Sequence, residues 1–370
     1  MATTCYLPEE IIFIILSLLP VKSLVRFSLV CKSWQSIISS THFIQTQRNN
    51  SEKKQPSSVL YCDYLNNVVY IDTPEDSVKL RLPSMFNDCK IKICSCNGLV
   101  CLAGFSKPFV YIWNPSTRRF KILPAPNKRS IQCDPYMGFG FDPVSSDYKI
   151  LRIVMNSVMV GGSFAYVTEA ELYSANNDSW KDIEIPETLK RFLPLRSSNC
   201  VYTKNGVVYV EGYDGVLSFD LKNEEFGILY QHPHNTLGKS RIFEIEGYVA
   251  MIFRVEGSDN VWMLDDVCGK LSWTKKFNLD IIHEKDYEVQ CLYLGDEQYV
   301  TVNDGRYINS KNQEIKKFDP PRELTSIINY AESLVSLEGF EKQECSGKHR
   351  IMEETRVKRF ARYLCCINGM

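Results

Sequence analysis

The apolar positions of this chain follow one pattern near the N-terminus and another over most of the remaining length. From residue 7 to residue 43 they fall at helical spacing, interrupted at Pro20, which ends one helix and lets another begin. From residue 59 to about residue 337 they form short runs rich in Val, Ile, Tyr and Phe, separated by Gly, Asn, Asp and Pro. Runs of this kind are typical of many short strands. The sequence therefore predicts an α+β protein of several domains, with a small helical unit before an all-β domain.

Three short helices are expected in the N-terminal unit. Pro8 followed by Glu9 and Glu10 is typical of a first helical turn, because proline is tolerated there and carboxylates favour the positive end of the helix dipole. A second helix is expected to begin near Val21, and a third to lie around residues 34–38.

The first of these helices is apolar on two opposite sides. One stripe consists of Ile11, Ile14, Ile15, Leu18 and Leu19, and the opposite one of Ile12, Phe13 and Leu16. A unit of about forty residues rarely supports a core that could cover both sides, so the second side needs a partner. A membrane-spanning helix is not indicated. The apolar run between Glu10 and Pro20 has nine residues, whereas a spanning helix needs ~20. No signal-peptide pattern surrounds this run.

This stretch resembles an F-box, the motif by which substrate receptors dock onto the Skp-type adaptor of cullin ubiquitin ligases. The matching segments are LPEE at 7–10, LPVKSL at 19–24, RF at 26–27 and VCKSW at 30–34. A helical cap on a larger domain is the alternative interpretation. The residues that the resemblance assigns to the adaptor interface, as contacts or as support, are Leu7, Pro8, Ile11, Leu19, Pro20, Val21, Leu24, Val30, Lys32 and Trp34.

The β domain contains an internal repeat of an apolar strand, a polar turn with Asp or Asn, and a second strand that closes in proline. Copies lie at 66–83, 110–126, 170–186, 216–233 and 261–280, and a sixth begins at 316–337. A period near ~45 residues is that of a four-stranded propeller blade, so we expect a propeller of about six blades. Residues 138–154 are expected to add an extra strand pair, and residues 325–337 to supply the strand that closes the ring.

Several segments of the β domain look like the kelch-like F-box-associated domain of plant F-box proteins. They are SCNGLVCL (95–102), WNPSTRRFKILP (113–124), GFGFDPVSSDYKIL (138–151), AELYSANNDSW (170–180), GVLSFDLKNEEF (215–226) and YAESLVSLEG (330–339). The predicted organisation is an F-box at 1–44, a linker at 45–58, the F-box-associated domain at 59–340 and a basic tail at 341–370. The tail segment 352–366 could form a basic amphipathic helix.

Charge and cysteine content add little to this organisation. The net charge is −1, with +2 on residues 1–50, +3 on residues 341–370 and −6 on the residues between them, so neither a nucleic-acid partner nor a membrane is expected. The chain has 14 cysteines and no secretory signal, which favours a reducing compartment, cytoplasmic or nuclear. The tightest group, Cys94, Cys96 and Cys101 with Cys89 upstream, lacks the spacing of a zinc site and is expected to be buried in strands.

No motif for catalysis, a cofactor or a metal was found, and the acidic residues at the repeat turns are expected to be Asx-type turn residues. The resemblance implies a non-catalytic receptor that binds the Skp-type adaptor, and through it a cullin, and holds an unknown protein substrate for ubiquitination. One alternative is an S-locus F-box receptor for basic self-incompatibility ribonucleases. Another is a propeller enzyme or sugar-binding domain with an incidental helical cap. Candidate target-binding loops, all expected at one rim, are Phe105–Phe109, Asn156–Phe164 and Gln231–Lys239.

Overall fold

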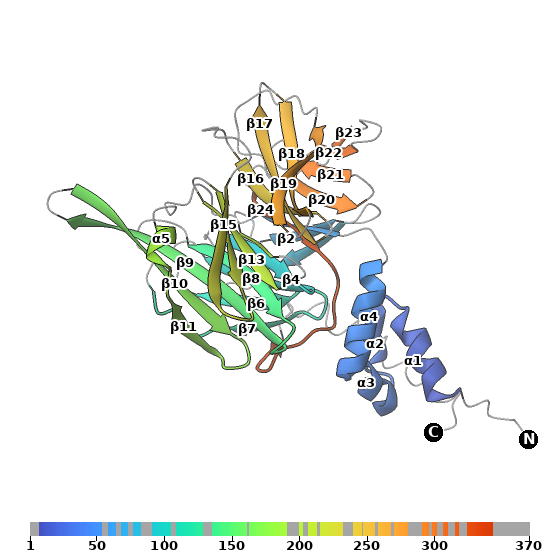
Figure 1. Ribbon diagram of the computed structural model, residues 1–370. Coiled ribbons are helices and arrows are strands. Elements are labelled where there is room, and N and C mark those ends of the chain that lie inside the picture. The colour runs from blue at the N-terminus through green and yellow to red at the C-terminus, as the bar shows by residue number, and fades with distance from the viewer. Residues whose placement is uncertain are drawn as a thin grey trace, which may run out of the picture.

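The computed structural model places four helices beside a ring of β-sheets (Figure 1). It describes residues 7–53, 58–63, 68–72, 77–82, 91–104, 109–128, 135–160, 163–190, 200–202, 206–212, 215–231, 240–245, 247–255, 258–267, 270–279, 291–295, 298–301, 306–309, 315–317 and 324–342.

The N-terminal helices are α1 (Glu9–Ser17), α2 (Val21–Phe27), α3 (Lys32–Ser39) and α4 (Thr41–Lys53). The first three confirm the predicted helices. Pro8 and Pro20 are the caps before α1 and α2, and each carbonyl accepts hydrogen bonds from amides of the following turn. Pro8 was expected to be the first helical residue, but it is the cap, one position before the first helical residue Glu9.

Helix α4 corrects the predicted linker, because residues 45–53 belong to a helix. Its inner side carries Phe43 and then Gln47, both almost fully buried, and Asn50, whose side-chain amide donates to the carbonyl of Ser17 at 3.4 Å. A helix that meets its neighbours partly through amide side chains leaves no apolar period in the sequence.

The described strands form six sheets, and the propeller-like β domain expected from the sequence is confirmed. The first sheet has the order β24 (Leu324–Tyr330), β1 (Ser58–Asp63), β2 (Val68–Asp72), β3 (Ser77–Arg81). The second has the order β4 (Ile91–Cys96), β5 (Leu99–Gly104), β6 (Val110–Asn114), β7 (Arg119–Ile122), β25 (Glu341–Lys342). The third has the order β8 (Tyr136–Asp142), β9 (Asp147–Val160), β10 (Ser163–Ser174), β11 (Ser179–Ile183).

Each of the remaining three sheets has four strands. The fourth has the order β12 (Cys200–Tyr202), β13 (Val207–Glu211), β14 (Gly215–Asp220), β15 (Glu225–Gln231), and a short helix, α5 (Glu187–Lys190), precedes it. The fifth has the order β16 (Ser240–Ile245), β17 (Tyr248–Val255), β18 (Ser258–Val267), β19 (Lys270–Leu279). The sixth has the order β20 (Cys291–Gly295), β21 (Gln298–Thr301), β22 (Arg306–Asn309), β23 (Ile315–Lys317).

The ring closes through the first strand of every sheet. Strand β24 contacts β4, β4 contacts β8, β8 contacts β12, β12 contacts β16, β16 contacts β20, and β20 contacts β24 again. In the first sheet this inner strand comes from the C-terminal part of the chain and pairs antiparallel with β1. The predicted closing strand is therefore confirmed for residues 325–330, whereas residues 331–337 leave the sheet. Such closure protects strand edges that an open sheet would expose.

The first five sequence repeats are the outer hairpins of five sheets, from β2–β3 to β18–β19. The predicted sixth repeat is not a hairpin, because it runs from the outer strand β23 of the last sheet to the inner strand β24 of the first. Residues 138–154 are not an extra pair either. They form the inner strands β8 and β9 that the third sheet needs to reach the ring.

The same turn recurs at the hairpins of neighbouring sheets. A side-chain oxygen at the end of one strand accepts a backbone amide from the turn, and the residue before the next strand has φ between 50° and 59°. The first residues are Asn114, Asp142, Ser174 and Asp220, and the left-handed residues are Arg118, Ser146, Asp178 and Glu224. The prediction that acidic residues serve as Asx-type turn residues is confirmed for Asp142 and Asp220.

Candidate protein-binding surfaces

Helix α1 separates its two apolar stripes as the sequence predicts. Leu16 is almost completely buried among the other helices, and Ile12 and Phe13 pack partly against the same cluster. The other stripe faces outward. Its exposed members are Ile11, Ile14, Ile15 and Leu18, with exposed fractions of 42–54%, and Leu7 before the helix is exposed at 56%. Leu19, which was predicted for this stripe, instead packs partly against the helical core. Adjacent exposed apolar side chains of this size mark an interaction surface rather than a solvated one.

A second apolar feature lies where α2 is followed by α3. Leu29 is 64% exposed, while Val30 and Trp34 are half-buried. The ring of Trp34 meets that of Phe27 edge-on, with centroids 5.4 Å apart, and the backbone amide of Trp34 donates to the Cys31 thiol at 3.5 Å. These contacts fix the start of α3 and hold Leu29 outward.

The structure divides the predicted adaptor residues into surface and support. Leu7, Pro8, Ile11, Pro20 and Lys32 are exposed, and Leu19, Val30 and Trp34 are half-buried. Val21 and Leu24 are core residues with at most 1% exposure, so they support the surface without reaching it. The exposed large apolar residues of the described helices and their connections that the predicted set omits are Ile14, Ile15, Leu18 and Leu29. The first three were recognisable by their helical spacing with Ile11, whereas Leu29 lies outside any helix and carries no such signal.

The two edges of the ring differ in what they carry. Because strands alternate in direction, connections within the inner and outer hairpins lie at one edge, and connections from second to third strands and between sheets lie at the other. The hairpin edge faces the helices. The β4–β5 turn at this edge lies against Ser333, and the next residue, Leu334, packs into the core of the helices. The described ends of the three predicted target-binding loops lie at the opposite edge, since each loop follows a second or a fourth strand. Residues 105–108, 161–162 and 232–239 of these loops lie outside the described residues.

One described feature projects from that opposite edge. Strands β9 and β10 pair from Lys149–Ser174 as far as Val160–Ser163, well beyond the register that β8 and β11 cover. Figure 1 shows this ribbon extending away from the helices. Its exposed large apolar residues are Val158, Met159, Tyr166 and Val167. We call residues 154–160 and 163–169 the arm; they include the described part of the predicted loop Asn156–Phe164.

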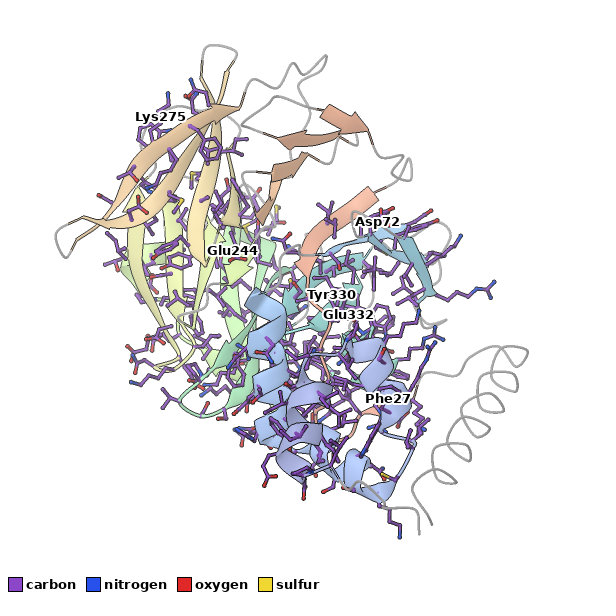
Figure 2. The ribbon with its side chains drawn as sticks, turned by 90° about the vertical axis from the view of Figure 1, so that its right-hand side faces the viewer. Phe27, Asp72, Glu244, Lys275, Tyr330 and Glu332 are labelled. Atoms are coloured by element: carbon purple, nitrogen blue, oxygen red, sulfur yellow. The ribbon has the colours of Figure 1, made fainter. Side chains whose placement is uncertain are left out.

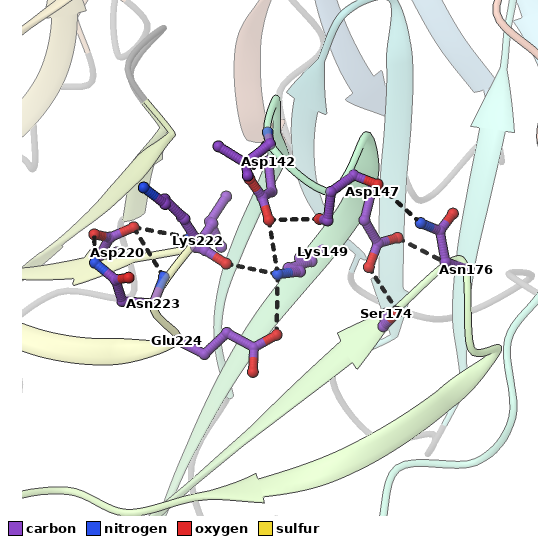
Figure 3. A network of polar contacts seen from close by, with 12 residues as sticks. Asp142, Asp147, Lys149, Ser174, Asn176, Asp220, Lys222, Asn223 and Glu224 are labelled. Atoms are coloured by element: carbon purple, nitrogen blue, oxygen red, sulfur yellow. Dashed lines mark hydrogen bonds and ion pairs between the residues drawn. The ribbon is translucent and has the colours of Figure 1, made fainter.

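Buried charges of the third sheet form a network with structural partners (Figure 3). The ammonium of Lys149 lies 3.1 Å from the Asp142 carboxylate and 2.9 Å from that of Glu224, and donates to the carbonyl of Leu221 at 2.6 Å. Burial alone would raise the pKa of Asp142, but hydrogen bonds from Ser145 and Lys149 outweigh it and hold the pKa below its usual value. This network joins the third sheet to the fourth.

A second buried ion pair, Arg152 and Glu171, also has several hydrogen-bond partners. Arg152 donates to Glu171 and, at 2.7 Å, to the carbonyl of Lys128, while Glu171 also accepts the backbone amides of Asn127 and Lys128 at 2.9 and 3.2 Å. Charges with this many fixed partners have a structural role, since removing one partner would leave the other buried and uncompensated. They leave no free group for proton transfer.

Two cysteines of the second sheet, Cys96 and Cys101, are buried as predicted, whereas Cys94 is half-buried and Cys89 lies outside the described residues. Cys96 and Cys101 lie in the core between the second and third sheets, and Cys94 packs partly against it. Burial raises the pKa of the Cys94 thiol to about 11, and nearby Lys92 opposes the shift. A thiol so rarely ionised is a poor nucleophile and metal ligand. Within the described residues no group of His, Cys, Asp and Glu side chains could hold a metal ion, and no helix is long and apolar enough to cross a membrane.

Comparison with known proteins identifies both parts of the chain. The family described as F-box domain matches residues 5–46, and the family described as F-box associated beta propeller domain matches residues 30–298. Among relatives in Arabidopsis thaliana, F-box protein At2g21930 is 28% identical, covering 73% of this chain and 71% of its own length. F-box protein At3g07870 is 26% identical over 74% of this chain and 72% of its own. F-box/kelch-repeat protein At3g23880 is 23% identical over 74% and 79%.

Proposed function

Because this chain belongs to the F-box proteins that carry an F-box associated β-propeller domain, we propose that it is the substrate-binding subunit of a Skp–cullin–F-box ubiquitin ligase. In this function the helices bind the Skp-type adaptor, and the propeller binds a target protein. The chain itself catalyses no step. It holds the target close to the conjugating enzyme, which converts a bimolecular encounter into transfer within one complex.

The observation that carries the proposal is the exposed stripe of α1. Three large aliphatic side chains of this nine-residue helix, and Leu18 directly after it, remain about half exposed, although the opposite side of the same helix is buried. Complete burial of an aliphatic side chain of this size contributes about 1.5–3 kcal/mol, so covering the exposed half of these four side chains by a partner would be favourable. An apolar surface of the adaptor would do so.

The distribution of features over the propeller supports the other half of the proposal. The helices lie at the hairpin edge of the ring, and the arm lies at the other edge, where longer connections can recognise a target. An adaptor and a target could therefore bind at the same time without competing for one surface.

Adaptor binding by full-length variants tests this proposal. The purified chain should bind a Skp-type adaptor, and the double change Ile11→Asp and Ile15→Asp should reduce the affinity at least about tenfold, because it places two charges in the apolar contact. The matched control is Val144→Asp, which makes the same kind of change at a residue that is 68% exposed on the propeller. Equal affinity of the double variant and the wild type would contradict the proposed interface.

The finer alternatives are not favoured by any described contact. The hypothesis of an S-locus receptor predicts binding of basic ribonucleases, with an affinity that decreases as the salt concentration rises. This hypothesis stays a prediction. The hypothesis of a propeller enzyme has no support from the two buried charge clusters described above, because their charged groups are hydrogen-bonded or ion-paired to neighbouring residues of the fold.

A further inference from the structure

The segment that follows the closing strand lies between the helices and the propeller. We call residues 331–337 the strap. Leu334 is 9% exposed and belongs to the core of the helical unit, together with Leu16, Val21, Leu24, Ile37, Ile38 and Phe43. Its neighbour Val335, with Leu337, packs instead against the core between the second and third sheets. Successive strap residues thus enter two different cores.

The strap is fixed to the propeller by polar contacts to β6 and its turn. The fully buried side-chain amide of Asn114 donates to the carbonyls of Ser333 at 2.9 Å and Val335 at 2.8 Å. Its side-chain oxygen accepts the amide of Ser116 at 2.9 Å, so the turn itself orients the donor group. Just before the strap, the hydroxyls of Ser116 and Tyr330 lie 2.6 Å apart. Figure 2 shows Tyr330 and Glu332 at the junction of the helices and the sheets.

Gly98 completes this attachment. With Asn97 it forms the β4–β5 turn, in which both residues have positive φ, 53° and 76°. A Cβ added to Gly98 would lie 2.2 Å from the Cβ of Ser333 and 2.6 Å from the carbonyl oxygen of Ala331. Any side chain at this position would therefore displace the strap.

We infer that the F-box of this chain is completed by the strap, and that Gly98 and Asn114 are positioning residues for the adaptor-binding helices. Leu334 fills the helical core only while β24 closes the ring and Asn114 holds the strap. A receptor with an unclosed propeller would thus have an incomplete F-box. The consequence for the ligase, which rests on the proposed function, is that only a fully folded receptor binds the adaptor tightly, with its target edge at a fixed distance from the adaptor.

Hydrogen exchange of the full chain tests the inference independently of any adaptor. In Leu334→Ala, amides of α2 to α4 should exchange at least about tenfold faster than in the wild type, since the helical core loses a buried leucine. Amides of β13 and β14 should keep their protection, because they lie in another sheet and report folding of the propeller. Unchanged exchange of α2 to α4 in this variant would overturn the inference.

A pair of glycine variants separates the strap from backbone strain. Gly98→Ala and Gly206→Ala both place alanine at positive φ, 76° and 81°, but a Cβ at Gly206 would meet its nearest atom, of Pro143, at 3.5 Å. Gly98→Ala should therefore accelerate exchange in the helices and weaken binding of the Skp-type adaptor, while Gly206→Ala should do neither. Equal effects of the two changes would also overturn the inference. If the wild type fails to bind the adaptor, the proposed function fails, whereas the exchange measurements still decide the role of the strap.

Discussion

Lys149 of the third sheet and Glu224 of the fourth form an ion pair of 2.9 Å, in which the lysine side chain is only 5% exposed. Glu224 also pairs with Lys181, whose side chain is 54% exposed. One carboxylate thus joins a buried and an exposed lysine. The two lysines allow the effect of burial on such a pair to be measured within one protein.

We predict that Lys149→Met destabilises the propeller by about 3–5 kcal/mol, because it leaves the buried Asp142 carboxylate without its cation. Lys181→Met should cost less than about 1 kcal/mol, since an exposed pair is screened by water. Denaturant unfolding followed by tryptophan fluorescence measures both. A loss of similar size in the two variants would show that burial does not make the loss of the lysine more costly.

The stability of the chain should fall as the pH drops below about 4. The pKa of Asp142 is lowered in the fold, because hydrogen bonds from Ser145 and Lys149 outweigh the opposing effect of burial. A carboxyl whose pKa is lower in the folded state than its ordinary 3.8 stabilises the fold above that value, and this contribution is lost as the pH falls through the folded pKa. Thermal midpoints at pH 5, 4 and 3 should decrease in the wild type. In Asp142→Asn they should start lower at pH 5 and change less, and an equal slope would exclude Asp142 as a source.

The closing strand makes truncation a sensitive test of the ring. A fragment ending at residue 323 lacks β24 and leaves an edge of β1 unpaired, so we expect it to aggregate. A fragment ending at residue 342 keeps β24, the strap and β25, and should remain soluble with a single cooperative melt. Size-exclusion chromatography and calorimetry of the two fragments distinguish these outcomes. A monomeric, cooperatively melting 1–323 fragment would show that the ring does not need its C-terminal strand.

The sequence predicted those elements whose pattern is local. The outer hairpins, the first three helices and the two stripes of α1 follow from periodicity and turn residues alone. Helix α4 was missed because Gln47 and Asn50 occupy inward positions that an apolar pattern would mark. The strap was predicted to be part of the closing strand, since side chains that point alternately to two sides are typical of a strand. Leu334 and Val335 do point to two sides, but each enters a different core, that of the helices and that between the second and third sheets.

The residues of the proposed adaptor surface were predicted only in part. Resemblance to the F-box identified Leu7, Pro8 and Ile11, which are exposed, but it also included Val21 and Leu24, which are buried. Residue identity cannot separate a contact from its support. The attachment of Asn114 to Ser333 spans 219 positions, and no spacing rule connects residues so far apart.

The arm provides the last prediction. Met159 and Tyr166 are 68% and 59% exposed, and both strand positions point to the same face of the ribbon, because Tyr166 pairs with Ser157, two residues before Met159. Large, exposed apolar side chains at the edge remote from the helices are suited to anchoring a target, and truncating such an anchor typically weakens binding about tenfold or more. We therefore expect the double change Met159→Ser and Tyr166→Ser to reduce the target recovered with the chain from proteasome-inhibited cells, at unchanged recovery of the adaptor. Val144→Ser, at an equally exposed apolar residue of the hairpin edge, should change neither. Unchanged recovery of the same target proteins by the arm variant would place the target site elsewhere on the propeller, because the arm would then carry exposed apolar residues without contributing to binding.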